Sequence, residues 1–65
     1  MIQLNNRPYP YTQGLTVAAL LQAENFIYPR IVVHLNGVLV EPERYGDTPI
    51  HDGDTVLAVH LMAGG

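Results

Sequence analysis

The chain of 65 residues contains no cysteine and no lysine. The absence of cysteine excludes disulfides, a catalytic thiol and thiolate zinc sites. A domain this short often needs disulfides or a metal for stability, so packing and sheet hydrogen bonds must stabilise this one. The lack of cysteine is consistent with a reducing compartment, and we expect the protein in the cytoplasm.

Positive charge is also scarce. Arg7, Arg30 and Arg44 are the three basic residues against six carboxylates, which gives a formal net charge of −3. Proteins that bind nucleic acid usually carry a basic patch or stripe, and three scattered arginines cannot form one. We therefore expect no nucleic-acid partner.

Long apolar runs are missing as well. The longest uninterrupted run, Val17–Leu21, has five residues, whereas a secretory signal needs roughly 7–15 and a membrane-spanning helix about 20. We expect neither a leader nor a membrane anchor. A chain of this length also buries only about 60% of its unfolded surface. Because so small a core cannot support a self-contained catalytic cleft, we do not expect an enzyme.

The first half of the chain predicts two short strands and one helix. Met1–Asn5 alternates as a strand, and Asn5-Asn6 suits a turn because asparagine tolerates the left-handed region. Pro8 and Pro10 lack a donor for a ladder, so the second strand can only be an edge strand or a poorly paired one. Thr16 predicts the N-cap of a helix that ends near residues 24–25.

The second half predicts three more strands. β-Branched residues favour strands over 31–35 and 38–40. Asn36-Gly37 joins them, and this dipeptide is the strongest short hairpin signal. Residues 41–49 are polar and are expected to be irregular, with Tyr45 and Ile50 as apolar anchors. Residues 51–54 are expected to form a tight turn before a last strand over 55–61.

The order of these elements predicts an α+β domain, a mixed sheet of about five strands with one main helix packed on one face. Residues 1–61 would form this domain, and residues 62–65 a flexible C-terminal tail ending in Gly-Gly. Alternation along a strand predicts that the core face is shared by Ile31, Val33, Leu35, Leu57, Val59 and Leu61. The exposed apolar set would be Val32, His34, Val56, Ala58 and His60. Such a set is either ordinary apolar surface or a face on which a partner docks.

The usual signs of a catalytic or metal site are missing. His34, His51 and His60 lack ligand spacing and are expected to be surface or partly exposed histidines. The Asp-Gly-Asp stretch at 52–54 has too few oxygen atoms for a calcium loop, which needs about five ligands over about 12 residues. Glu41 and Glu43 flank a proline and are expected to be solvated loop charges. We therefore expect no metal site.

The last two residues, Gly64 and Gly65, are the strongest candidate site. A terminal diglycine can simply be a loose end, but residues without a Cβ can also extend through a narrow channel. A carboxylate is a poor acyl donor. Adenylation by ATP turns it into a mixed anhydride, from which a sulfur or amine nucleophile displaces AMP. In this interpretation Ala63 and Gly64 thread with Gly65 into the active site of a partner.

Several stretches taken together resemble one known family. They are Thr16-Val17 with Leu20-Leu21, Leu35-Asn36-Gly37 with Val38 and Val40, Asp52-Gly53-Asp54, and Ala63-Gly64-Gly65. In order, spacing and total length they resemble the ThiS family of ubiquitin-like sulfur carriers, which has the β-grasp fold and acts in thiamin biosynthesis. The segment from Pro8 to Tyr11 departs from the family pattern.

The resemblance implies a carrier protein rather than a catalyst. A ThiF-type adenylating enzyme would dock on the exposed apolar set and use ATP and magnesium to adenylate Gly65. Sulfur from a cysteine-desulfurase persulfide would replace AMP and leave a C-terminal thiocarboxylate, which thiazole synthase would use. The carrier would bind no cofactor tightly and would be a monomer when free.

Other functions stay open. The small subunit of molybdopterin synthase is another β-grasp carrier with the same terminal chemistry, and other sulfur pathways use similar carriers. A ubiquitin-like protein modifier belongs to a different class and would be found in isopeptide-linked adducts. A β-grasp binding module is the third, and deletion of Gly64 and Gly65 would leave its function intact.

Overall fold

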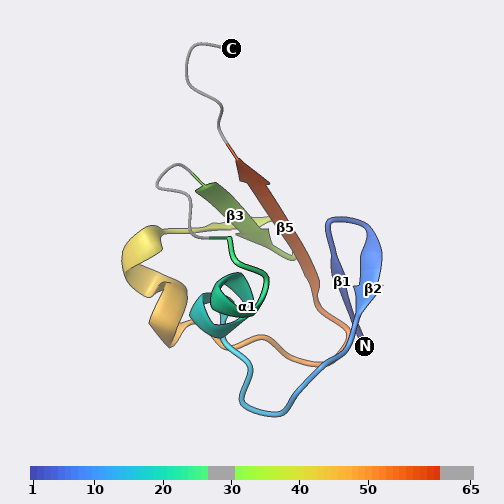
Figure 1. The fold of residues 1–65 in the computed structure, drawn as a ribbon. Coiled ribbons are helices and arrows are strands. Elements are labelled where there is room, and N and C mark those ends of the chain that lie inside the picture. Colours follow the sequence, from blue (N-terminus) through green and yellow to red (C-terminus); the bar gives the residue numbers. More distant parts are fainter. Residues whose placement is uncertain (27–30, 61–65) are drawn as a thin grey trace.

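The structure is a computed structural model and describes residues 1–26 and 31–60 (Figure 1). Five strands, one α-helix and one 3-10 helix make up the described part of the chain. In chain order they are β1 (Ile2–Leu4), β2 (Arg7–Tyr9), α1 (Val17–Ala23), β3 (Ile31–Leu35), β4 (Val38–Val40), η1 (Pro42–Asp47) and β5 (Thr55–His60).

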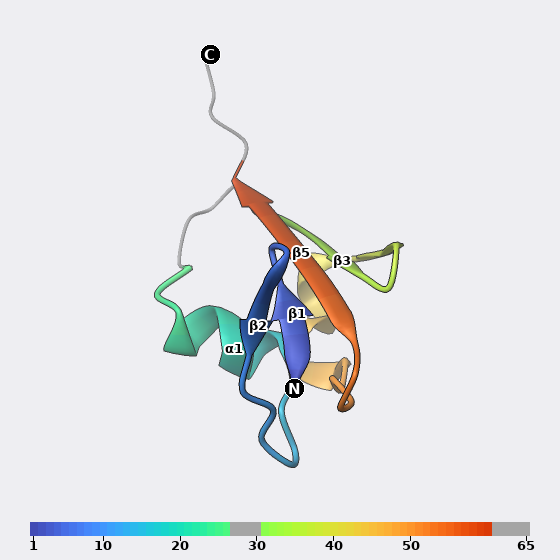
Figure 2. The ribbon, with the colours of Figure 1, turned by 90° about the vertical axis from the view of Figure 1, so that its right-hand side faces the viewer.

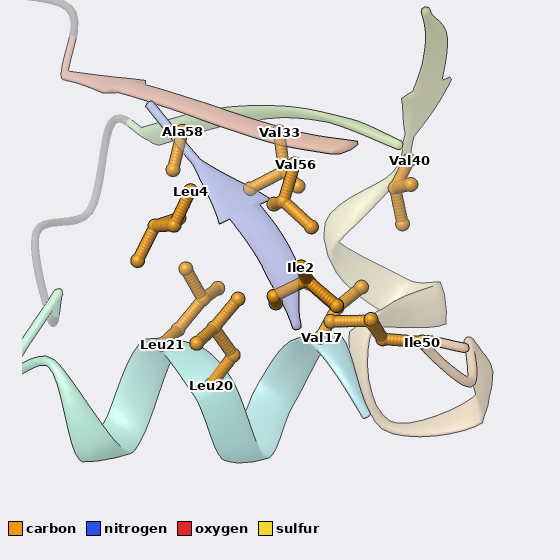
Figure 3. Packing of buried hydrophobic residues seen from close by; sticks show 10 residues of the cluster. All are labelled: Ile2, Leu4, Val17, Leu20, Leu21, Val33, Val40, Ile50, Val56 and Ala58. Atoms are coloured by element: carbon orange, nitrogen blue, oxygen red, sulfur yellow. The ribbon is translucent and has the colours of Figure 1, made fainter. Parts of the chain in front are cut away.

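The strands form one sheet in the order β2-β1-β5-β3-β4, so the last strand in sequence lies at its centre. β1 runs parallel to β5, and the other neighbouring strands are antiparallel. α1 packs across one face, and the buried side chains lie between it and the sheet (Figure 3). This arrangement confirms the predicted α+β architecture, a mixed five-stranded sheet with one main helix.

The first hairpin turns at two asparagines. Asn5 and Asn6 have φ angles of 52° and 66°, in the left-handed region that asparagine tolerates better than most residues. Pro8 of β2 pairs with Gln3 of β1, and β2 lies at the edge of the sheet. An edge strand can contain a proline, because the main chain on its outer side makes no ladder hydrogen bonds and the missing N–H is not needed there. The predicted edge strand is therefore confirmed, although it begins at Arg7 and ends at Tyr9.

The helix begins and ends where the sequence predicts. Thr16 has an extended backbone, and its Oγ1 accepts a hydrogen bond of 3.2 Å from the Ala19 amide, as an N-cap should. The buried residues of α1 follow helical spacing and are Val17, Leu20 and Leu21. α1 ends at Ala23, and the chain then reverses at Asn25 with a φ of 60°.

The structure confirms the predicted turn of the second hairpin and the two predicted anchors after it, but the expected irregular segment is a helix. Asn36 and Gly37 both have positive φ angles, 52° and 81°, which the two-residue turn requires. Residues 41–49 were expected to be irregular, whereas η1 occupies Pro42–Asp47. Pro42 begins this helix, at a position where its missing N–H has no helical partner to lose. Both predicted anchors are confirmed: Ile50 is buried, and Tyr45 packs against the core.

The predicted distribution of side chains between the two faces of the sheet is wrong for β5. In the register between β3 and β5, Val33 pairs with Ala58 and Leu35 with Val56. Directly paired residues point to the same face, so Val56 and Ala58 face α1 with Val33. Their exposed fractions are 0% and 5%. Leu57 and Val59, predicted for the core, are 40% and 44% exposed, and Leu61 lies outside the described residues.

Among residues 1–26 and 31–60, the core contains ten buried apolar residues, which come from every strand except β2, from α1 and from the segment after η1. They are Ile2, Leu4, Val17, Leu20, Leu21, Val33, Val40, Ile50, Val56 and Ala58 (Figure 3).

Candidate functional site

The C-terminal candidate site follows directly on the central strand of the sheet. β5 pairs with β1 on one side and with β3 on the other (Figure 2). His60 ends β5, and the predicted threading residues, Ala63, Gly64 and Gly65, lie outside the described residues. Their role, and that of residues 62–65 as a tail, therefore stays a prediction.

Contacts on both edges of β5, and on the face toward α1, fix its last residues. His60 pairs with Ile31 of β3, and its ring meets Phe26 edge-on with ring centres 5.4 Å apart. The main chain of Ala58 is hydrogen-bonded to the side chain of Asn5. The strand that leads to the candidate site is thus fixed up to its last described residue.

The face of the sheet opposite α1, here called the outer face, carries a second candidate site. Register places Val32 opposite Val59, and His34 opposite Leu57, and each such pair shares a face. The outer face therefore holds Val32, His34, Leu57, Val59 and Leu39, of which Leu39 is 57% exposed.

The predicted docking set is divided between the two faces. Val32 and His34 lie on the outer face. Val56 and Ala58 are buried beneath α1, and His60 lies on that side of the sheet, beside Phe26. Sequence reasoning missed Leu57 and Val59 as members of the exposed apolar set because it placed them in the core. Both faces of β5 are apolar, so only the register with β3 distinguishes them.

The aspartates of the acidic turn before β5, residues 51–54, bond to neighbouring parts of the chain. The Asp54 carboxylate accepts bonds from the His51 amide at 2.8 Å and from the Asn36 side chain at 3.1 Å. These donors, the His51 amide foremost, hold the pKa of Asp54 below its ordinary value. Asp52 pairs with the N-terminal amine of Met1. The turn thereby joins the start of β1 and the second hairpin to the start of β5.

The three histidines, for which the sequence predicts no metal site, are dispersed. His34 lies on the outer face, His51 in the acidic turn and His60 at the end of β5. Within residues 1–26 and 31–60, no three histidine, aspartate or glutamate side chains are grouped so that they could hold a metal ion. In that same part of the chain, no helix is long and apolar enough to cross a membrane.

Two tyrosines fix peripheral segments to the body of the domain. Tyr9 donates a hydrogen bond of 2.8 Å to the Glu24 carboxylate, which joins β2 to the end of α1. This bond raises the pKa of Tyr9, and burial and the negative charge of Glu24 act in the same direction. Tyr45 donates to the Ile31 carbonyl at 3.3 Å. Its pKa is raised chiefly by burial, with a contribution from the charge of Glu43.

The family model that matches this chain is described as the ThiS family, and the match covers residues 2–65. Among solved structures, the crystal structure of the thiamine biosynthesis protein (ThiS) from Geobacter metallireducens is 31% identical, with a TM-score of 0.82. The similarity covers 98% of this chain and 97% of that one. The NMR structure of a thiamine biosynthesis protein from the same organism has a TM-score of 0.77 at 31% identity, over 98% of this chain and 86% of that one. These likenesses confirm the predicted β-grasp fold.

Two curated relatives are each 30% identical over 64 residues, which is 98% of this chain. One is a thiazole synthase of Magnetococcus marinus, and the chain spans only 20% of its length. The other is the uncharacterized protein ycf40 of Porphyra purpurea, of which the chain covers 90%.

Proposed function

This chain belongs to the ThiS family, and we propose that it is a sulfur carrier of thiamin biosynthesis, with Gly65 as the residue that carries the sulfur. The observation that carries the proposal is the extent of the family match. It runs from residue 2 through residue 65, so it includes both the folded domain and the diglycine. The similarity to a thiamine biosynthesis protein over nearly the whole of both chains supports the same role.

The proposed chemistry begins at the Gly65 carboxylate. One carboxylate oxygen attacks the α-phosphorus of ATP, pyrophosphate leaves, and a mixed anhydride with AMP forms. ATP and magnesium are held by a ThiF-type adenylating enzyme, where the metal neutralises phosphate charge. The carrier supplies only the acyl group, so it is a co-substrate and not an enzyme.

Sulfur then replaces AMP. The terminal sulfur of a persulfide, formed by a cysteine desulfurase, attacks the activated carbonyl carbon, and AMP leaves. A second thiol attacks the cysteine sulfur of this acyl disulfide, forms a new disulfide with it and releases the thiocarboxylate of Gly65. We place these steps in the cytoplasm and assign the carrier no tightly bound cofactor.

Thiazole synthase is the proposed acceptor of the sulfur. Its support is the relative from Magnetococcus marinus, a protein named thiazole synthase that contains a 64-residue stretch similar to this chain. That protein thus contains, in one polypeptide, a stretch similar to this chain and the rest of a protein named thiazole synthase. We propose that this chain passes its sulfur to a thiazole synthase.

The outer face is the proposed docking surface for the adenylating enzyme. It is apolar: Leu39, Leu57 and Val59 are exposed there, and the half-buried Val32 lies opposite Val59. A contiguous exposed apolar patch on a small domain commonly marks an interface. Docking through this face would keep α1 and the core undisturbed, so that the domain can bind and leave without unfolding.

The proposal is tested by activation in vitro. The protein is incubated with a ThiF-type enzyme, ATP and magnesium, and pyrophosphate release is measured for the intact chain and for a variant without Gly64 and Gly65. We expect release that depends on the diglycine. Equal release from both proteins would contradict the proposal, and isopeptide-linked adducts in cells without any thiocarboxylate would favour a protein modifier.

A further inference from the structure

The ladder between β1 and β5 is continued by a side chain after the main chain of β1 has ended. Along this parallel pair, the Gln3 amide donates to the Asp54 carbonyl at 3.0 Å, and the Asn5 amide to the Val56 carbonyl at 2.9 Å. In a parallel ladder the next such bond would reach Ala58 from a residue two positions after Asn5. The chain has by then turned away into β2 through Asn5 and Asn6.

The carboxamide of Asn5 takes the place of the missing peptide group. Its Nδ2 donates to the Ala58 carbonyl at 3.1 Å, and its Oδ1 accepts from the Ala58 amide at 2.7 Å. A carboxamide has the same donor and acceptor as a peptide group, so it can satisfy both main-chain groups of Ala58 at once. Aspartate offers no donor here, and serine is shorter.

The positive φ of Asn5 is part of this arrangement. At 52° it turns the main chain toward β2 while the Asn5 side chain bonds to β5. Leu4, the residue before it, points into the core beside Ala58 (Figure 3). The turn, the core contact and the carboxamide therefore act on the same short stretch of β5.

We propose that Asn5 is a positioning residue for the activation of Gly65. On the β1 side of β5, both main-chain groups of Ala58 are bonded to the Asn5 carboxamide, and on the opposite side Ala58 pairs with Val33. By fixing Ala58 in the plane of the sheet, Asn5 sets the line along which β5 leads toward the terminus. This role rests on the proposed function, because it matters only if Gly65 must reach a partner's active site.

The expected effect lies in turnover and not in docking. Misplacing a reacting group by about 1 Å can cost roughly 100-fold in rate. Loss of the Asn5 carboxamide should therefore lower kcat for pyrophosphate release by roughly 10- to 100-fold. The outer face is not touched by this change, so the dissociation constant of the complex without ATP should be unchanged.

The test compares Asn5→Gly with Asn6→Gly as a matched control. Glycine adopts positive φ at no steric cost, so both variants keep the turn. Only Asn5→Gly removes the carboxamide that bonds to Ala58. Hydrogen exchange measured by NMR should show a faster-exchanging Ala58 amide in Asn5→Gly alone. Asn5→Asp is the second variant. It keeps the size of the side chain and the acceptor for the Ala58 amide but loses the donor, and it should also lower kcat.

The outcomes separate this inference from the function on which it rests. A lower kcat for Asn5→Gly, with the dissociation constant and the Asn6→Gly control unchanged, would support the role of Asn5. Normal turnover of Asn5→Gly despite faster exchange at Ala58, or unchanged exchange at Ala58, would overturn it while leaving the proposed function intact. Absence of pyrophosphate release from the wild-type chain would overturn the proposed function and the role of Asn5 with it.

Discussion

Val56 and Leu57 are consecutive residues of β5 that point to opposite faces of the sheet. Val56 is fully buried under α1, and Leu57 is 40% exposed on the outer face. A single position along the strand thus separates a residue that stabilises the fold from one that is available to a partner. The same substitution at the two positions should have different consequences.

Val56→Glu should unfold the protein. An uncompensated charge in the core costs several kcal/mol, and a chain of this length has a total stability of roughly 3–10 kcal/mol. Circular dichroism and urea titration would detect the loss of structure. A cooperative unfolding transition within about 0.5 kcal/mol of wild type would contradict the burial of this side chain.

Leu57→Glu should leave the fold intact and weaken activation. Surface substitutions usually change the free energy of unfolding by less than about 0.5 kcal/mol, and loss of a central interface residue commonly costs about tenfold or more in affinity. We expect the KM of the ThiF-type enzyme for the carrier to rise about tenfold. Val38→Glu is the control, since Val38 is exposed but pairs with Leu35 and lies off the outer face. Equal effects of the two variants would place the docking surface elsewhere.

Thr16→Ala should destabilise the protein by about 1 kcal/mol, because the Ala19 amide loses its N-cap acceptor. Thr16→Ser keeps the hydroxyl and should retain most of that stability. The free energies come from urea titration of the three proteins under the same conditions. If the alanine and serine variants are equally stable, the hydroxyl contributes nothing to the helix.

Asp54 should make the free energy of unfolding depend on pH in the acidic range. Its pKa is lowered in the folded state by the bonds from the His51 amide and the Asn36 side chain. The unfolded chain, with an ordinary pKa of about 3.9, therefore binds a proton first as the pH falls. This contribution is fully present above that value and is lost as the pH falls through the folded-state pKa.

The substitution Asp54→Asn tests this pH dependence. It should destabilise the protein at pH near 7, and the difference from wild type should shrink below a pH of about 4. Urea titrations across this range measure the difference. A difference that stays constant with pH would show that the charge of Asp54 plays no part.

Local features of the fold were predictable because they depend on neighbours in the chain. The Asn36-Gly37 turn, the Thr16 cap and the apolar spacing of α1 each need only a few consecutive residues. The edge position expected for the strand that contains Pro8 likewise follows from that residue alone. These predictions were confirmed.

The register between β3 and β5 could not be read from the sequence. Alternation fixes which residues of one strand share a face, but it does not relate two strands that are distant in the chain. In β5 both alternating sets are apolar, Val56 with Ala58 and Leu57 with Val59, so hydrophobicity does not choose between them. In the structure the smaller pair, Val56 with Ala58, is the one that is buried.

The contact between Asn5 and Ala58 could not be predicted from the sequence either. Asn5 was correctly predicted as a turn residue, but its second role needs β5, which lies about fifty residues further along the chain. The candidate diglycine, in contrast, was identified from sequence alone and lies outside the described residues.

Intact mass spectrometry tests the central claim most directly. The protein is incubated with a ThiF-type enzyme, ATP, magnesium and a cysteine desulfurase with cysteine, and its mass and C-terminal fragments are recorded. The account predicts a mass increase equal to the exchange of one oxygen for one sulfur, located on Gly65, and its loss when thiazole synthase and its substrates are added. An unchanged mass under these conditions, or a sulfur located on any other residue, would contradict it.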